Sequence, residues 1–263
     1  MKNIVITGST RGIGYGLADA FLARGCGVVV SGRSQAGVEQ AVAQLARRHD
    51  PARILGQPCD VTVYEQVQAL WDTAARHFGQ VDIWINNAGL AQILTSFWDL
   101  APSQMQEVVD TNVLGTMYGS KVALLGMKKQ GFGSLYNMEG YGSRGRRMTT
   151  GLTLYGSTKA AIAFLNDSLV DELKGGPIIM GMLRPGMVAT DMLYNQRTGD
   201  TADWERSKRV FNILADRVET VAPWLADRIL SNQQHGAQIS WLTPGKVLWR
   251  FLSAPFIKRQ VME

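Results

Sequence analysis

The chain has 263 residues, of which 46% are hydrophobic and 19% are charged, and this balance excludes a disordered protein and predicts a packed core. No apolar run reaches the ~18 to 20 residues of a membrane-spanning helix, and the start MKNIVITGST lacks the apolar centre of a signal peptide. The net charge of +5 is scattered, which disfavours nucleic acid as a partner and is consistent with an anionic small ligand. We therefore expect a cytoplasmic globular protein.

Short Val/Ile-rich runs alternate with longer helical patterns as far as residue 183. Strands are predicted at residues 4–7, 27–31, 53–59, 81–86, 134–138 and 177–183, and helices at residues 13–24, 35–48, 62–78, 102–128 and 152–174. The strands show no in-out alternation, which is typical of strands covered on both faces. The pattern predicts an α/β fold of the Rossmann type, a doubly wound parallel sheet with helices on both faces.

The alternation breaks after about residue 190. Helical stretches are expected near 201–217 and 220–231, followed by a short strand near 238–242. We interpret residues 1–263 as one domain, with a cofactor-binding and catalytic core over about 1–191 and a substrate-covering segment and tail over about 192–263.

Cysteine and histidine give no indication of a metal site or a disulfide. Cys26 and Cys59 each lie beside a strand-like run, so we expect buried free thiols. His49, His77 and His235 have no metal-ligand spacing, and no metal is expected.

A glycine-rich turn separates the first predicted strand from the first predicted helix. Glycines let the backbone turn tightly and approach a pyrophosphate, and the helix N-terminus offers free N–H groups and the positive end of its dipole. A plain turn would place these glycines at a cost in helix stability and with no benefit. We therefore predict a dinucleotide-phosphate site at Thr7, Gly8, Ser9, Thr10, Arg11, Gly12, Ile13 and Gly14.

The end of the second strand is where a fold of this type meets the adenosine ribose. No Asp or Glu stands there to accept a hydrogen bond from a free 2′-hydroxyl. Arg33, together with Arg11, offers positive charge to a 2′-phosphate instead. NADPH is therefore favoured over NADH, and the alternative is that both arginines are only solvated.

Tyr155 and Lys159 are four residues apart and share one face of the helix predicted at 152–174. An ammonium group beside a phenol favours the phenolate, so we expect Lys159 to lower the pKa of Tyr155. Such a tyrosine can pass a proton to a carbonyl oxygen while the carbonyl carbon receives a hydride. The pair alone is a weak indication, because this spacing occurs in many helices.

The order of several motifs is more specific than any one of them. The glycine turn is followed by Asp60, then by Asn86-Asn87-Ala88-Gly89, Asn112, Tyr155-x-x-x-Lys159 and Arg184-Pro185-Gly186. Over residues 3–191 the chain resembles the short-chain dehydrogenase/reductase family. The resemblance implies that Asn112 holds a water in a proton relay through Lys159, which also binds the nicotinamide ribose. It implies further cofactor contacts at Asp60, Val61, Asn87, Ala88, Gly89, Pro185, Gly186, Val188 and Thr190.

The serine that this family places after the fifth strand is missing. Aligned on that strand, its position falls on Gly140, and the loop that follows is longer than usual. Losing one donor to the substrate oxygen typically lowers the rate by ~10²–10³. Ser143 could fold back to replace it, or Glu139 could act if protonated in an apolar pocket. Glu139 could also grip a substrate group or pair with a nearby arginine.

The unusual segment narrows the resemblance. Tyr136-Asn-Met-Glu-Gly-Tyr-Gly-Ser143, with the Tyr155-Gly-Ser-Thr-Lys159 helix and the stretch 184–191, looks like the chlorophyll(ide) b reductases. That subgroup implies reduction of the C7 formyl group of chlorophyll b by NADPH, here in a bacterial relative. Two alternatives stay open: a reductase of another carbonyl compound, or a dinucleotide-binding sensor with little turnover.

A large apolar substrate is expected from the soft side chains predicted near the cleft. These are Met148, Met187, Met192, Trp98, Trp204 and Trp224, although each could equally be core packing. The resemblance to the short-chain dehydrogenase/reductase family implies that the helix near 104–121 pairs subunits in a homodimer or homotetramer. For the tail from residue 245, a packing arm is favoured over peripheral contact with a membrane.

Overall fold

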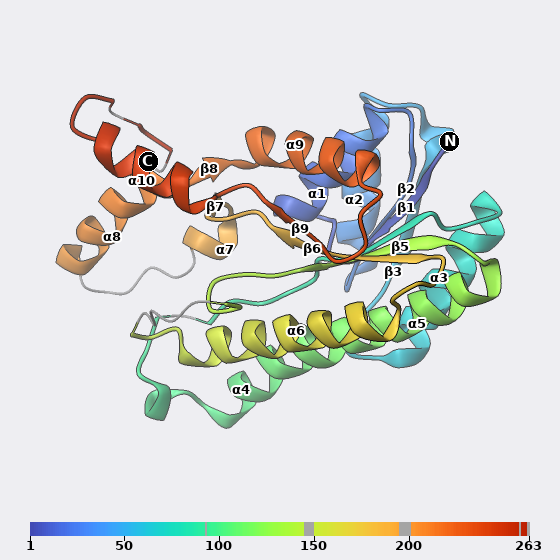
Figure 1. The fold of residues 1–263 in the computed structure, drawn as a ribbon, viewed down its shortest axis with the longest axis horizontal. Helices are drawn as coiled ribbons and strands as arrows, with labels where there is room; N and C mark the ends of the chain where they lie inside the picture. Colours follow the sequence, from blue (N-terminus) through green and yellow to red (C-terminus); the bar gives the residue numbers. More distant parts are fainter. Residues whose placement is uncertain (93, 145–149, 195–200, 258, 262–263) are drawn as a thin grey trace.

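The computed structural model describes residues 1–92, 94–144, 150–194, 201–257 and 259–261, with the side chains of residues 194 and 201–207 excepted. Within these residues, seven parallel strands form a sheet in the order β3-β2-β1-β4-β5-β6-β9 (Figure 1). The strands are β1 (Asn3–Ile6), β2 (Gly27–Gly32), β3 (Ile54–Pro58), β4 (Ile83–Asn86), β5 (Gly133–Met138), β6 (Ile178–Arg184) and β9 (Ala237–Ser240). The doubly wound α/β fold expected from the sequence is confirmed.

Helices cover both faces of this sheet (Figure 1). One face carries α1 (Gly12–Leu22), α2 (Gln35–Ala46) and α9 (Val218–Ser231), and the other carries α3 (Tyr64–Phe78), α4 (Pro102–Val109), α5 (Gly115–Gln130) and α6 (Thr153–Glu172). Beyond the carboxyl ends of the strands lie α7 (Asp191–Tyr194), α8 (Thr201–Leu214) and α10 (Pro244–Ser253), with the short strands β7 (Val188–Ala189) and β8 (Asp216–Arg217).

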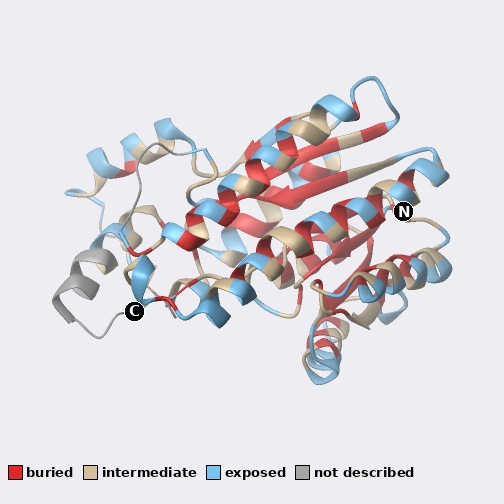
Figure 2. Ribbon diagram, turned by 90° about the horizontal axis from the view of Figure 1, so that it is seen from below, coloured by how far each residue is buried: buried red, intermediate tan, exposed pale blue. Residues whose placement is uncertain are grey.

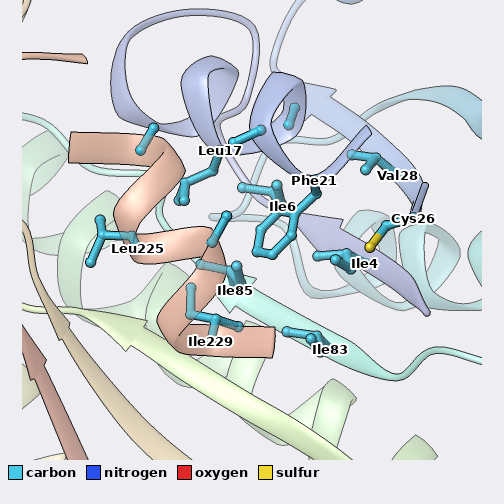
Figure 3. Close-up of a cluster of buried hydrophobic side chains, with 14 of the residues drawn as sticks. Ile4, Ile6, Leu17, Phe21, Cys26, Val28, Ile83, Ile85, Leu225 and Ile229 are labelled. Atoms are coloured by element: carbon cyan, nitrogen blue, oxygen red, sulfur yellow. The ribbon is translucent and has the colours of Figure 1, made fainter. Parts of the chain in front are cut away.

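Successive residues of each strand point into two different cores. Ile4 and Ile6 of β1 pack against Phe21 of α1 and Leu225 of α9 (Figure 3). Val5, between them, belongs to the core on the α3 and α5 side. Buried residues accordingly run along the strands and the sheet-facing sides of the helices (Figure 2). The strands are apolar throughout because both of their faces are covered.

The structure differs from the expected elements most clearly in three places. The helix predicted at 102–128 is interrupted by a π-helical segment, Asp110–Leu114, which a hydrophobic pattern does not indicate. The helix expected to reach residue 217 ends at Leu214, because the chain then pairs as β8 with β7. Helix α10 was not predicted, since Pro255 argued against a helix near the C-terminus.

Both cysteines are buried free thiols, as expected. Burial raises the pKa of Cys26 and raises that of Cys59 to about 12, so both thiols keep their protons at neutral pH. In the described part of the chain, every helix is too short or too polar to cross a bilayer.

Candidate active site

The glycine turn is folded into a cradle at the N-terminus of α1. Gly8 and Gly12 adopt φ angles of +64° and +59°, in the left-handed region that favours glycine. A Cβ atom on Gly8 would lie 2.7 Å from the Cα atom of Ala88, and one on Gly14 would lie 2.4 Å from the Gly8 carbonyl oxygen. Positions 8 and 14 must therefore be glycine, because β1, α1 and the loop after β4 approach one another too closely for a side chain there.

Hydrogen bonds hold this cradle in place from both sides. On the β2 side, the Ser9 backbone N–H donates to the Ser31 carbonyl oxygen at 2.8 Å. On the β4 side, the Asn87 side-chain amide donates to the carbonyl oxygens of Thr7 and Gly8 at 3.0 and 2.9 Å. The Thr7 hydroxyl accepts from the backbone N–H groups of Asn87 and Ala88.

The start of α1 is chemically suited to an anion. No side chain caps its N-terminus, and its first turn contains no acidic residue. Its N–H groups and the positive end of its dipole therefore stay available. The cradle and this helix end together fit the pyrophosphate of a nicotinamide dinucleotide.

The predicted 2′-phosphate arginines are exposed and only loosely paired. The side chain of Arg33 is 61% exposed and lies 3.4 Å from Glu107, and that of Arg11 is 73% exposed and lies 3.6 Å from Asp191. Exposed pairs of this kind are weak, so either guanidinium can take another anion. A hollow of about 330 Å³ adjoins Arg11, lined by Thr10, Arg11, Gly37, Gln40, Ala41 and Gln44.

The remaining predicted cofactor residues lie in loops at the carboxyl ends of the strands. Asp60 accepts hydrogen bonds from the backbone and hydroxyl of Thr62, which shapes the turn after β3. Gly186 has φ +73°, and a Cβ atom there would lie 2.5 Å from Leu242. Gly12 faces Thr190, whose methyl group would lie 3.5 Å from a Cβ atom on it. Val188 differs, because it is buried in the core beside α1 and α9.

Tyr155 and Lys159 both reach the end of β5, where the family serine is missing. A Cβ atom on Gly140 would lie 2.6 Å from the Tyr155 hydroxyl and 3.2 Å from Cε and Cγ of Lys159. The Lys159 Nζ donates to the Met138 carbonyl oxygen at 3.2 Å and would lie 3.8 Å from a Cβ atom on Gly89. The tyrosine hydroxyl thus occupies the space that a side chain at position 140 would need.

Burial controls the protonation of this pair. It raises the pKa of Tyr155 to about 12, which is opposite to the lowering expected from Lys159. It lowers the pKa of Lys159 to about 8, while the negative charge of Glu139 raises that pKa in part. The expectation failed because burial disfavours the tyrosinate and is the one cause of the shift. At neutral pH both groups carry their protons.

Asn112 lies in the π-helical segment and joins the loop after β4 to α6. Its side chain accepts from the Leu90 backbone N–H at 2.7 Å and donates to the Leu90 carbonyl oxygen at 2.9 Å. It also donates to the Thr158 hydroxyl at 3.1 Å, and that hydroxyl donates to the Tyr155 carbonyl oxygen at 2.7 Å. The Asn112 side chain is therefore engaged with protein groups, and its role in a water relay stays a prediction.

Gln92 is a site residue that the sequence did not indicate. Its buried side chain accepts from the Tyr155 backbone N–H at 2.8 Å and donates to the Gly151 carbonyl oxygen at 2.6 Å. It therefore fixes the first turn of α6 to the loop after β4. Only its short distance in sequence from Asn86-Asn87-Ala88-Gly89 could have drawn attention to it.

Glu139 lies in a polar, cationic environment rather than in the apolar pocket that an acid role requires. Its side chain is fully buried, and Arg184 donates from Nε to it at 2.7 Å. Arg144 lies 3.7 Å away, and the Asn166 amide donates to it at 3.1 Å. The structure therefore supports the expected pairing with an arginine, with Arg184 as the principal partner.

Ser143 is brought back toward α6. Its backbone N–H donates to the Gly140 carbonyl oxygen at 3.2 Å, which closes a tight turn. Gly142, at φ +92°, packs so closely on α6 that a Cβ atom would lie 2.6 Å from the Cα atom of Gly156. The turn resembles the fold-back expected of Ser143, and the donor role of its hydroxyl stays a prediction.

The predicted pocket residues separate into different environments. Trp224 packs edge-on against Trp241 and the core, so it is a packing residue. Trp98 is 83% exposed and Met192 is 39% exposed at the carboxyl end of the sheet. Met148 and the side chain of Trp204 lie outside the described residues.

Comparison with known proteins identifies the family of the chain. The family model described as short chain dehydrogenase matches residues 2–201. A probable chloroplastic chlorophyll(ide) b reductase of Oryza sativa subsp. japonica is 33% identical over 96% of this chain and 52% of its own length. A chloroplastic chlorophyll(ide) b reductase of Arabidopsis thaliana is 38% identical over 86% of this chain and 65% of its own length. The chain thus spans about half to two thirds of these plant proteins.

Other relatives and solved structures share the fold. A 3α-hydroxysteroid dehydrogenase of Mediterraneibacter gnavus is 35% identical over 73% of this chain and 76% of its own length. The crystal structure of actinorhodin polyketide ketoreductase with NADPH has a TM-score of 0.80 at 23% identity, covering 91% of this chain and 95% of that one. A 3-ketoacyl-(acyl-carrier-protein) reductase from Brucella melitensis with NADH has a TM-score of 0.79 at 23% identity, over 91% and 96%. The chain belongs to the short-chain dehydrogenase family of oxidoreductases, which use a nicotinamide dinucleotide.

Proposed function

We propose that this chain uses NADPH to reduce a large apolar aldehyde or ketone, with the C7 formyl group of chlorophyll(ide) b as the first candidate. The observation that carries the proposal is the packing of the Tyr155 hydroxyl against Gly140 with Lys159 beside it. The substrate class is supported by the likeness to plant chlorophyll(ide) b reductases, which extends over 86% or more of the chain.

The residues at this site can supply and stabilise a proton. Bound NADPH would provide the hydride for the carbonyl carbon. Tyr155, whose pKa is raised to about 12 by burial, holds its proton at neutral pH and donates it to the carbonyl oxygen. Lys159 stays cationic below about pH 8 and stabilises the tyrosinate that remains after the transfer. The carbonyl compound gains one hydride and one proton and becomes an alcohol.

In this proposal Glu139 is a positioning residue rather than an acid. It holds Arg184 and Asn166, so it ties the end of β5 to β6 and to α6. Its charge also favours the protonated form of Lys159. Its hydrogen bonds thus hold the end of β5 against α6, and its charge keeps Lys159 protonated, at the place where the family serine is missing.

The choice of NADPH rests on Arg33 and Arg11. Neither arginine is buried in an ion pair that would prevent contact with a phosphate. Arg33→Ala is expected to weaken NADPH binding by about tenfold or more and to leave NADH binding nearly unchanged. Equal losses for the two dinucleotides, measured by titration, would contradict the assignment.

The proposed function is tested by incubating the purified chain with NADPH and a panel of aldehydes and ketones that includes chlorophyllide b. We expect NADPH consumption and a product that is heavier than the substrate by two hydrogen atoms. Tight NADPH binding without consumption on any carbonyl compound would favour the sensor alternative instead. Turnover confined to small aldehydes would support the reductase activity but contradict the proposal of a large apolar substrate.

A further inference from the structure

The C-terminal segment exposes a group of large apolar side chains. We name as the tail patch the exposed residues of α10 and the chain after it: Leu248, Trp249, Phe251, Leu252, Phe256 and Ile257. Trp249 is 65% exposed and Phe256 is 88% exposed. Large aromatic and aliphatic residues gathered in this way mark interaction sites rather than ordinary surface.

The polarity of α10 is inverted relative to a surface helix of a globular protein. Its protein-facing side carries Arg250, which is 9% exposed, while the solvent-facing side carries Leu248, Trp249 and Leu252. An ordinary surface helix buries its apolar stripe and exposes its charges. In water alone, the exposed apolar side chains of α10 cost free energy that burial would recover.

Ionic contacts fix this orientation. Arg250 donates to both carboxylate oxygens of Asp216, at 2.9 and 2.7 Å, and Arg259 donates to Oδ1 at 2.6 Å. Trp241 donates from Nε1 to Oδ2 of the same carboxylate at 2.6 Å. The tail is thus fixed at residues 250 and 259 by Asp216. With these residues held against the protein, the tail patch faces the solvent.

In the segment from Arg228 to Met262, every charged side chain is positive. Between Asp227 and Glu263 the sequence contains no Asp or Glu, and its basic residues are Arg228, Lys246, Arg250, Lys258 and Arg259. Apolar and aromatic residues flanked by cations are the composition of helices that lie in the headgroup region of a bilayer. Anionic lipid headgroups complement the positive charge.

We propose that the tail patch docks this protein on the surface of an anionic lipid membrane, with α10 lying in the interface. A second copy of the chain fits less well. A symmetric contact would bring the same patch of both copies together, and with it a segment that stays net positive because Arg250 and Arg259 share the single carboxylate of Asp216. Helices α10 and α8 lie at the end of the molecule where the strands have their carboxyl ends (Figure 1). Docking there would turn the substrate side toward the membrane.

The proposal is tested by co-sedimentation of the full chain with vesicles of phosphatidylcholine alone or mixed with phosphatidylglycerol. We expect binding to the mixed vesicles that weakens as salt is raised. Exchanging Trp249 and Leu252 for serine is expected to weaken it by about tenfold or more. The control is Phe164→Ser on α6, a residue that is 77% exposed but outside the tail patch, and it should bind as the parent chain does.

Three results would overturn the proposal. The first is a parent chain that sediments with neither vesicle. The second is equal binding by the serine variant, once its thermal unfolding and NADPH binding match those of the parent. The third is a patch-dependent oligomer in analytical ultracentrifugation without vesicle binding, which would assign the surface to a second copy. None of these results depends on catalysis, so the proposed function is tested separately.

Discussion

Glu139 and Asp216 are both buried carboxylates paired with arginines, yet they serve different parts of the molecule. Asp216 binds Arg250, Arg259 and Trp241 and joins β8 to the tail. Burial raises its pKa, but the hydrogen bonds and charges of its partners outweigh this and lower it overall. Glu139 has its own arginine, but its charge also acts on Lys159. The same ion-pair chemistry fixes the tail at Asp216, whereas at Glu139 it also acts on Lys159, the lysine proposed to assist the reaction.

The largest expected effect on stability comes from removing one arginine at each site. Arg184→Met leaves the fully buried Glu139 with Asn166 and the more distant Arg144, and we expect a loss of about 3 kcal/mol in the free energy of unfolding. Arg259→Met leaves Asp216 with Arg250 and Trp241, and a loss of about 1 kcal/mol is expected. Denaturant titration of both variants gives the comparison. Equal losses would show that the two carboxylates are held alike.

A second prediction concerns the missing serine. Gly140→Ser restores the family residue, but its Cβ atom would lie 2.6 Å from the Tyr155 hydroxyl, so the tyrosine must move. We expect kcat to fall by about tenfold rather than to rise. Gly245→Ser is the control, because a Cβ atom there has no neighbour within 4 Å. A higher kcat in Gly140→Ser would contradict the close packing at Gly140.

The smallest effect is a shift in pH dependence. Lys159, with a pKa of about 8 instead of 10.5, loses its proton as the pH rises through about 8, so kcat/KM for reduction should fall above that pH. Glu139→Gln removes the charge that raises this pKa and should move the fall toward lower pH. Asp216→Asn should leave the profile in place. A profile unmoved by Glu139→Gln would limit Glu139 to a structural role.

The sequence indicated most of the fold because apolar runs and glycines act locally. The β1 strand, the turn at Gly8 and Gly12 and the helix bearing Tyr155 and Lys159 depend on neighbouring residues, and all were placed correctly. The ion pair of Glu139 with Arg184 joins residues 45 apart, and no local pattern marks it.

Two further features depend on context that a pattern does not contain. The amphipathic sequence of α10 does not show which of its sides faces the protein, and only the contact of Arg250 with Asp216 decides this. The direction of the Tyr155 pKa shift could not be predicted from the sequence, because it depends on how deeply the phenol is buried.

The most direct test of the account is the turnover of Tyr155→Phe with NADPH and a carbonyl substrate of the parent chain. The substitution removes only the hydroxyl that packs against Gly140, so NADPH affinity and thermal stability should be retained. We expect kcat to fall by about 10²–10⁴ because the carbonyl oxygen loses its proton donor. A variant that keeps most of the parent kcat would contradict the assignment of Tyr155 as the acid.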